Sequence, residues 1–499
     1  MVESRTILNV KNCVVSYSVS FLISCIALIY VWIFIPEYMG WTLINFVVVS
    51  GAVLFFNLLS VIEVIRGRMK VSNPLCLFSI WNIMMFNMTL IGFCISPLYI
   101  LQRLNFGSSL FPNGIAGVSV KFLYLTYGEI VALLYIVIVL IINNKYRVED
   151  LKYVFQSRDI KVLKILTVLL LMLAVVSFYV VYHFDYINII LYKLGSLDNK
   201  SIEIGSARWY MFMKMYSYFV SLALLAYFWN MKNSFKKKLF IGILLIFGIM
   251  IQLPSGGRVD LLALILLYTF QLLSFGIKVK KKTIKILMFV FIVLMLFVTV
   301  FRTLPEIKGN GNFFSSRTVQ TVMIERVQNI SGTFVSVDRT QNIAMLIYML
   351  NENNYFLHGR TVAEGIIYPV HNYLALLLPM KKIDSRRANY YTAMWRFGTT
   401  RNISELPVSL PGEFYFQFGV YSVIVFSIIF GFLLKSMREL ESKSKQLIFR
   451  WSVYTSLILV ILYSSSDILE IVGKIVVYIF SIYILFWLVK LFVRGKNEN

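Results

Sequence analysis

Charged residues are scarce in this chain: they make up 14% of its 499 residues, whereas hydrophobic residues make up 59%. No water-soluble core buries that fraction of apolar side chains, so the composition excludes a soluble globular protein and indicates a membrane protein. The formal net charge of +24 does not point to nucleic acid in such a chain, because basic loops that face anionic lipid produce the same balance.

Residue patterns that bind metals or nucleotides are also missing. The chain has no Asp-x-Asp pair to hold a divalent ion for a nucleotide sugar, and no GxxxxGK[ST] loop to cradle the phosphates of ATP or GTP. Its few cysteines and histidines are too scattered for a disulfide framework or a metal triad: Cys13, Cys25, Cys76, Cys94, His183, His358 and His371. We therefore expect neither a metal nor a cofactor.

Long apolar runs dominate what is present. Each is long enough, or nearly so, to cross a bilayer as a helix, and they number about twelve. They lie near 17–35, 41–63, 76–100, 121–142, 163–182, 209–229, 239–254, 259–277, 286–302, 412–435, 451–466 and 469–490. The sequence predicts an all-α polytopic membrane protein.

Every second connection between these runs is rich in lysine and arginine. By the positive-inside rule those connections face the cytoplasm, which places both termini inside and predicts a multi-pass membrane protein. The chain then divides into spans one to nine (1–302), a large outer segment (303–411), and spans ten to twelve with a short cytoplasmic tail (412–499).

The outer segment 303–411 is unusual in its arginines, because cationic residues are usually sparse on that side of a membrane. They are Arg317, Arg326, Arg339, Arg360, Arg386, Arg387, Arg396 and Arg401, with Arg302 just before them. Guanidinium groups bind phosphate with paired hydrogen bonds, so a bound anion is expected; local pairing with the segment's carboxylates is the alternative. Helical spacing over 319–327, 342–350 and 361–378, interrupted by Gly359, Gly365 and Pro369, predicts a fold of short helices.

Arg258 follows paired glycines at the turn between the seventh and eighth runs. A cation at the outer end of a helix needs a partner, and that partner is either a ligand anion or Asp260. Glu413 opens the tenth run, with Gln417 four residues later on the same helix face. It is either a helix cap or a partly desolvated general base.

A second polar group, Ser464-Ser465-Ser466-Asp467, lies between the last two runs, with Glu470 one turn later. Ionisable residues at such depth are candidate functional residues, although pairing with Arg258 or Arg302 would serve structure alone. Glu129 in the fourth run and His371 in the outer segment are weaker candidates of the same kind.

The order of these motifs resembles a known family. Gly256-Gly257-Arg258, then the segment 303–411, then Gly412-Glu413-Phe414-Tyr415-Phe416-Gln417-Phe418-Gly419 is similar to the bacterial oligosaccharide repeat-unit polymerases (O-antigen polymerases, Wzy class). The resemblance covers roughly 170–470 and depends on the combination of short motifs.

That resemblance implies a helical C-type glycosyltransferase-like architecture and an enzyme that acts without metal at the outer face of the bacterial cytoplasmic (inner) membrane. Its donor and acceptor would both be undecaprenyl-pyrophosphate-linked oligosaccharides, joined en bloc into O-antigen of lipopolysaccharide, capsule or a related polysaccharide. A chain-length-regulating co-polymerase is implied as a partner, besides membrane lipids.

On this basis the expected catalytic residues are Glu413, Arg258 and Asp467. Arg258, Arg302 and Arg317 are expected to bind the departing pyrophosphate. Tyr415, Gln417, Tyr391, Trp395 and Arg396 are expected to contact glycan, with interfacial anchoring as the alternative for the aromatic residues. An O-antigen ligase, a flippase or transporter of lipid-linked oligosaccharide, and a non-enzymatic scaffold are the competing functions.

Overall fold

The structure is a computed structural model of the whole chain. The residues that it describes are 10–34, 41–66, 69, 73–95, 118–143, 157–182, 207–229, 235–252, 258–275, 338–353, 356–378, 380–381 and 408–495. The predicted ninth span (286–302) and most of the segment 303–411 lie outside these residues.

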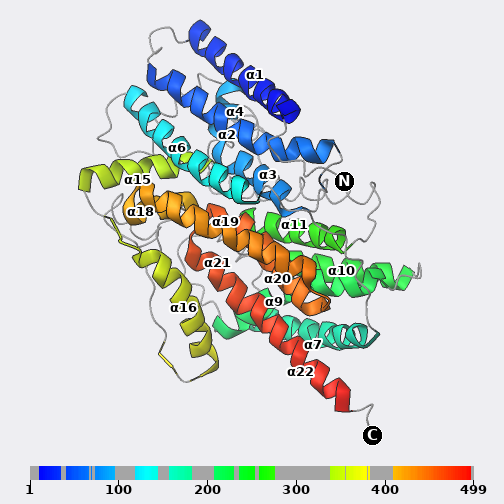
Figure 1. The fold of residues 1–499 in the computed structure, drawn as a ribbon. Coiled ribbons are helices and arrows are strands. Elements are labelled where there is room, and N and C mark those ends of the chain that lie inside the picture. Colours follow the sequence, from blue (N-terminus) through cyan, green and yellow to red (C-terminus); the bar gives the residue numbers. More distant parts are fainter. Residues whose placement is uncertain are drawn as a thin grey trace, which may run out of the picture.

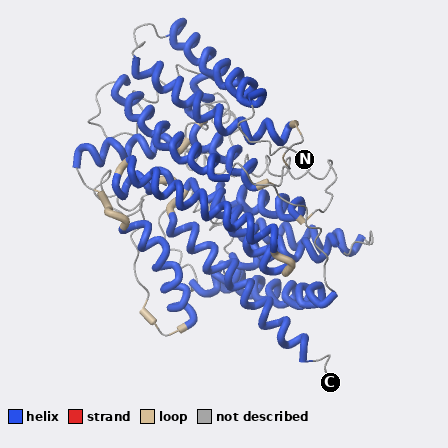
Figure 2. The backbone as a smooth tube through the Cα atoms, viewed as in Figure 1, coloured by secondary structure: helices blue, strands red, loops and turns tan. Residues whose placement is uncertain are grey.

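All regular elements in the described residues are helices (Figure 2). They are α1 (Val10–Phe34), α2 (Trp41–Ile65), α3 (Pro74–Phe86), α4 (Met88–Ile95), α6 (Val118–Asn143), α7 (Ser157–Tyr182), α9 (Ala207–Trp229), α10 (Phe235–Gln252), α11 (Arg258–Ser274), α15 (Thr340–Asn353), α16 (Arg360–Leu377), α18 (Leu410–Phe418), α19 (Val420–Lys443), α20 (Leu447–Leu462), η3 (Tyr463–Ser465), α21 (Ile468–Lys474), η4 (Ile475–Phe480) and α22 (Ser481–Gly495).

Six helical stretches in this part of the chain are long and apolar enough to cross a membrane, and a seventh is reached if the bent pair α3–α4 counts as one span. The six are Thr42–Val64, Ser119–Asn143, Arg158–Tyr182, Val420–Lys443, Leu447–Ser465 and Ile468–Val493. This confirms an α-helical, multi-pass membrane protein. The predicted count of about twelve is not reached: the described apolar stretches of α1, α10 and α11 are shorter, α9 is not among the counted spans, and 286–302 is not described.

Ionic contacts show that successive helices run in opposite directions. Arg450, near the start of α20, lies 2.8 Å from Glu441 at the end of α19, and it also donates to Ser274 O at the end of α11. Lys490 near the end of α22 lies 2.8 Å from Asp159 at the start of α7. We call this the basic end of the bundle, defined by Asp159, Arg438, Arg450 and Lys490.

The opposite end carries acidic residues, and we call it the carboxylate end, defined by Asp260, Glu413, Asp467 and Glu470. The helices α15, α16 and α18 gather at this end, away from the C-terminus (Figure 1). The two ends therefore differ in charge, and α19, α20 and the continuous stretch Ile468–Val493 (α21, η4 and α22) reach from one to the other.

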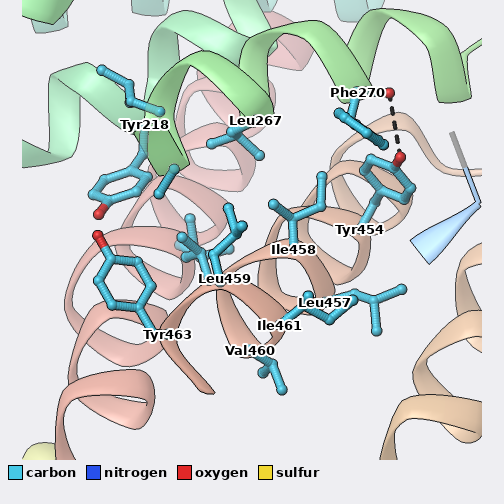
Figure 3. Packing of buried hydrophobic residues seen from close by; sticks show 14 of the residues in the cluster. Tyr218, Leu267, Phe270, Tyr454, Leu457, Ile458, Leu459, Val460, Ile461 and Tyr463 are labelled. Atoms are coloured by element: carbon cyan, nitrogen blue, oxygen red, sulfur yellow. Dashed lines mark hydrogen bonds between the residues drawn. The ribbon is translucent and has the colours of Figure 1, made fainter. Parts of the chain in front are cut away.

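Helix α20 forms the middle of the bundle, with 83% of its spanning stretch buried. Trp451 and Tyr454 are buried, and each satisfies its polar atom: Trp451 Nε1 donates to Ser221 Oγ (2.9 Å) and Tyr454 OH donates to Phe270 O (3.3 Å; Figure 3). The large tryptophan and tyrosine rings can be buried inside the bundle because the one N–H or O–H group of each donates a hydrogen bond. A firmly packed α20 fixes the position of the turn that follows it.

The predicted helical spacing over 342–350 and 361–378 is confirmed by α15 and α16. The predicted interruptions at Gly365 and Pro369 are wrong, because both lie inside the continuous helix α16; only Gly359, with a left-handed φ of 83°, marks its start. Gly365 has a packing role instead: a Cβ there would lie 3.0 Å from Leu469 N, so the glycine lets α16 approach α21 closely.

Candidate active site at the carboxylate end

Glu413 and Asp467 meet at the N-terminus of α21. The backbone N–H of Ile468 donates to Glu413 Oε2 across 2.8 Å, and the N–H of Glu470 donates to Asp467 Oδ1 across 2.9 Å. Their exposed fractions are 1% and 4%. Free N–H groups and the positive end of the helix dipole make this one of the few buried places where carboxylates are stabilised.

Local sequence explains how each carboxylate reaches this point. Pro411 lies in the first turn of α18, where its missing N–H costs nothing, and Glu413 follows within that turn. The turn η3 ends α20, and Asp467 then acts as the N-cap of α21. The two carboxylates come together because α18 and α21 both pack against α16.

Hydrogen bonds hold Glu413 in place from a third helix. Gln417 Nε2 donates to Thr361 Oγ1 on α16 (2.8 Å) and to Glu413 O (2.9 Å), and the Thr361 side chain hydrogen-bonds the Glu413 carboxyl. The predicted sharing of one face by Glu413 and Gln417 is therefore confirmed. Gln417 is fully buried, which makes it a positioning residue for the carboxyl.

The electrostatics of Glu413 suit proton exchange. Burial raises the pKa of its carboxyl to about 8, and the neighbouring Asp467 charge adds to this, whereas the Ile468 N–H and the Thr361 hydroxyl act in the opposite direction. Glu413 lies before the membrane span of α19. A carboxyl with a pKa of about 8 exchanges its proton within about one pH unit of neutrality, which suits general acid–base chemistry.

A second polar group lies beside the first, two helical turns further along α21. Lys474 Nζ lies 2.8 Å from Asp260 Oδ1 and 3.2 Å from Glu470 Oε1, and it sits 4.1 Å from the centroid of the Tyr463 ring. The Tyr463 hydroxyl donates to the same Asp260 oxygen. These contacts join the first turn of α11 to α21, so the start of α11, at Arg258, belongs to the carboxylate end.

Tyrosines line this second group. The hydroxyls of Tyr218 and Tyr463 point toward one another from different helices (Figure 3), and the Tyr218 ring stacks on Tyr478 at a centroid distance of 5.0 Å. Lys214 lies 5.3 Å from the Tyr210 ring centroid and donates to Gln252. Tyr218, Tyr463 and Lys214 are all buried, so these groups form a polar cluster inside the bundle.

Sequence reasoning missed Lys474 and Lys214, although a signal was present. Each is an ionisable residue inside a predicted apolar run, and such residues are functional candidates by default. The sequence also offered Asp260 as a partner for Arg258, and Glu470 as a partner for Arg258 or Arg302. The structure pairs both carboxylates with Lys474, and the side chains of Arg258 and Arg302 are not among those described.

The remaining predicted residues divide into two sets. Tyr415 is described and packs among hydrophobic residues of α18 and its neighbours. The backbone of Arg258 is described as the first residue of α11, but its side chain is not. Arg302, Arg317, Tyr391, Trp395 and Arg396 lie outside the described residues.

Two further predictions concern local ion pairs and metals. Arg360 pairs with Glu364 at 2.7 Å, which is the local pairing offered as the alternative role of the outer-segment arginines. Histidine, cysteine, aspartate and glutamate form no group of three suited to a metal within the described ranges.

No protein-family model, no curated protein and no solved structure matches this chain. Two desolvated carboxylates, one with its pKa raised to about 8, lie beside a buried cluster of tyrosines, and a carboxylate of that basicity can deprotonate a sugar hydroxyl group.

Proposed function

We propose that the protein is a membrane glycosyltransferase that polymerises undecaprenyl-pyrophosphate-linked oligosaccharide units into a surface polysaccharide. The observation that carries the proposal is the convergence of Glu413 and Asp467 on one helix N-terminus, with burial raising the pKa of Glu413 to about 8. The motif order around Gly256-Gly257-Arg258 and Gly412-Glu413 supports the choice of this family.

In the proposed step a hydroxyl oxygen of the acceptor sugar attacks the anomeric carbon of the donor. A carbon–oxygen bond forms there, while the bond from that carbon to the lipid pyrophosphate breaks and the electron pair leaves with the pyrophosphate. The proton of the attacking hydroxyl passes to Glu413, which general-base catalysis requires to be ionised beforehand. Asp467 raises the basicity of Glu413 through its charge.

The countercharge for the pyrophosphate is assigned to arginines. Around Glu413 the described carboxylates outnumber the described lysines, and Lys474 already pairs with Asp260 and Glu470. A dianionic leaving group would be repelled there without additional cations. The proposal therefore keeps Arg258, Arg302 and Arg317 as pyrophosphate ligands, with Tyr391, Trp395 and Arg396 as glycan contacts.

The proposed setting follows from the two ends of the bundle. The basic end would face the cytoplasm of the bacterial inner membrane, with both termini on that side, and the carboxylate end would face outward. Donor and acceptor would then reach the site from the outer leaflet, and a co-polymerase that sets chain length would act on the same face.

One experiment distinguishes the proposed polymerase from a ligase that uses the same donor. Purified protein in detergent, given only lipid-linked oligosaccharide, is expected to lengthen it without an ion gradient. A ligase would instead require lipid A core as acceptor and would leave lipid-linked substrate unextended. Substitution of Glu413 by glutamine is expected to abolish the lengthening.

A transporter of lipid-linked oligosaccharide is the second candidate, and one observation favours it. The span formed by α3 and α4 is broken at Asn87 with a bend of 59°, and broken spans with half-helix ends near the midplane are common in secondary transporters. Extension of the glycan by purified protein would decide against this candidate, because transport alone forms no bond.

A further inference from the structure

The break between α3 and α4 is held by a single carboxylate from the distant α15 segment. Asp338 Oδ2 accepts from Thr89 N in the first turn of α4 (2.6 Å), and Asp338 Oδ1 accepts from Thr340 N in the first turn of α15 (2.8 Å). The next residue, Arg339, donates its N–H to Met85 O near the end of α3 (2.6 Å). The broken helix and α15 are thus fixed to one another.

Oxygen atoms from four helices converge beside this break. Thr340 Oγ1 lies 3.4 Å from Glu129 Oε1 on α6 and 3.3 Å from Phe86 O, the last carbonyl of α3. The Ser50 hydroxyl on α2 faces the Glu129 carboxyl, and Asn87 Nδ2 donates to Ser50 O (2.9 Å). Gly128 makes the close approach possible, since a Cβ there would lie 2.8 Å from Thr340 O.

Two oxygens in this group have no hydrogen-bond partner among the described residues: Glu129 Oε2 and Asn87 Oδ1. Both side chains are fully buried. The Asn87 amide cannot be reversed, because its nitrogen donates to Ser50 O, which is only an acceptor. Buried acceptors left in this state are costly and call for a donor or a cation.

The charges lead to the same conclusion. Glu129 and Asp338 are both buried in this region, and the Arg339 guanidinium interacts electrostatically with Asp338 and also with Glu470, which already pairs with Lys474. Two carboxylates with one guanidinium leave a single negative charge in a medium of low dielectric constant. One monovalent cation would neutralise it, whereas a divalent ion would leave an excess of positive charge.

We propose that the α3–α4 break binds a sodium ion through oxygen atoms of Glu129, Asn87, Phe86, Thr340 and Ser50. Carboxylate, carbonyl, amide and hydroxyl oxygens are ligands for hard cations, and a carbonyl freed at the end of a half-helix is a recurrent sodium ligand in membranes. A proton on Glu129 would satisfy the charge but would leave Asn87 Oδ1 unpaired. The site does not depend on the glycosyltransferase proposal, because it lies around Glu129 and not around Glu413.

The test uses the full chain purified in detergent. Radioactive ²²Na⁺ is expected to bind saturably and to be displaced by unlabelled NaCl but not by choline chloride at equal concentration. The Tm is expected to be several degrees higher in NaCl than in choline chloride at the same ionic strength, because a ligand of the folded state stabilises it. Absence of saturable ²²Na⁺ binding to the wild-type protein, or equal Tm values in the two salts, would overturn the inference.

Variants locate the site. Glu129→Gln is expected to remove sodium binding, while Glu352→Gln, at an exposed position of α15, is expected to keep it. If Glu129→Gln does not fold, Thr340→Val provides a second probe, with an expected rise in the sodium Kd of at least about tenfold. A Tm that follows pH but not sodium would identify a proton in place of the ion and would also contradict the inference.

Discussion

Glu413 caps a helix other than its own: its carboxylate accepts the N–H of Ile468 at the start of α21, 2.8 Å away and 55 residues further along the chain. The alternatives of helix cap and general base are therefore not exclusive. The hydrogen bond places the carboxyl beside Asp467, and the resulting burial and like charge raise its pKa.

The coupling to Asp467 predicts a specific pH dependence. A general base acts when ionised, so elongation is expected to rise with pH through about 8, the pKa to which burial and Asp467 raise Glu413. Asp467→Asn removes the like charge, so the pKa of Glu413 falls and the rising limb moves to lower pH. A pH–rate profile of purified protein measures this; an unchanged limb would show that the two carboxyls do not act together.

Arg258→Ala is expected to reduce polymer length in cells to single repeat units at normal protein level. The reason is loss of a cation that stabilises the charge developing on the pyrophosphate. Gel analysis of the surface glycan, with immunoblotting of the membrane protein, provides the measurement. Full-length polymer in this variant would remove Arg258 from the mechanism.

The Lys474–Asp260 pair is expected to be needed for stability as well as for the shape of the site. Lys474→Met leaves Asp260 and Glu470 without their cation and should lower the free energy of unfolding by about 3 kcal/mol. Adding Asp260→Asn should recover part of that loss.

A matched control for this experiment is Lys443→Met, since the Lys443 side chain is 77% exposed and its contact with Glu439 is 3.8 Å long. Its expected effect is below about 1 kcal/mol. Equal losses for Lys443→Met and Lys474→Met in thermal unfolding would contradict the assigned role of the buried pair.

Gly365 provides a test of the contact between α16 and α21. Gly365→Ala places a Cβ 3.0 Å from Leu469 N and 3.1 Å from Ile468 Cγ2, so α16 must move, at a cost of about 1–3 kcal/mol. Gly473→Ala on α21 meets nothing within 4 Å and should be neutral or stabilising. Thermal unfolding of both variants gives the comparison, and equal Tm values would mean that the close contact is not required.

The sequence predicts most of the helices because lipid imposes a simple rule: long apolar runs become helices with internally satisfied backbones. The helix of α16 was predicted, but not its passage through Gly365 and Pro369, because the reason for Gly365 is a contact with α21 about 100 residues away. Local signals cannot reveal such packing.

For the candidate site, as for the fold, the sequence predicted individual residues but not how they pack together. Glu413 and Asp467 were recognisable as acidic residues at helix starts, since charges in an apolar sequence are conspicuous, and Gln417 was recognisable by its four-residue spacing from Glu413. Their meeting at α21, and the capping of α4 by Asp338 from 249 residues away, depend on tertiary packing alone. Lys474 was recognisable as an ionisable residue inside an apolar run. Its pairing with Asp260 was not predictable, because Asp260 lies on α11, 214 residues earlier in the chain.

The central claim is that Glu413 accepts the proton of the attacking sugar hydroxyl. The most direct measurement is single-turnover elongation of lipid-linked oligosaccharide by purified Glu413→Gln protein, with Glu352→Gln as the exposed control. The account predicts a rate about 10²–10⁴-fold below wild type for Glu413→Gln, with an unchanged Tm, and a wild-type rate for the control. A wild-type rate of elongation in folded Glu413→Gln protein would contradict it.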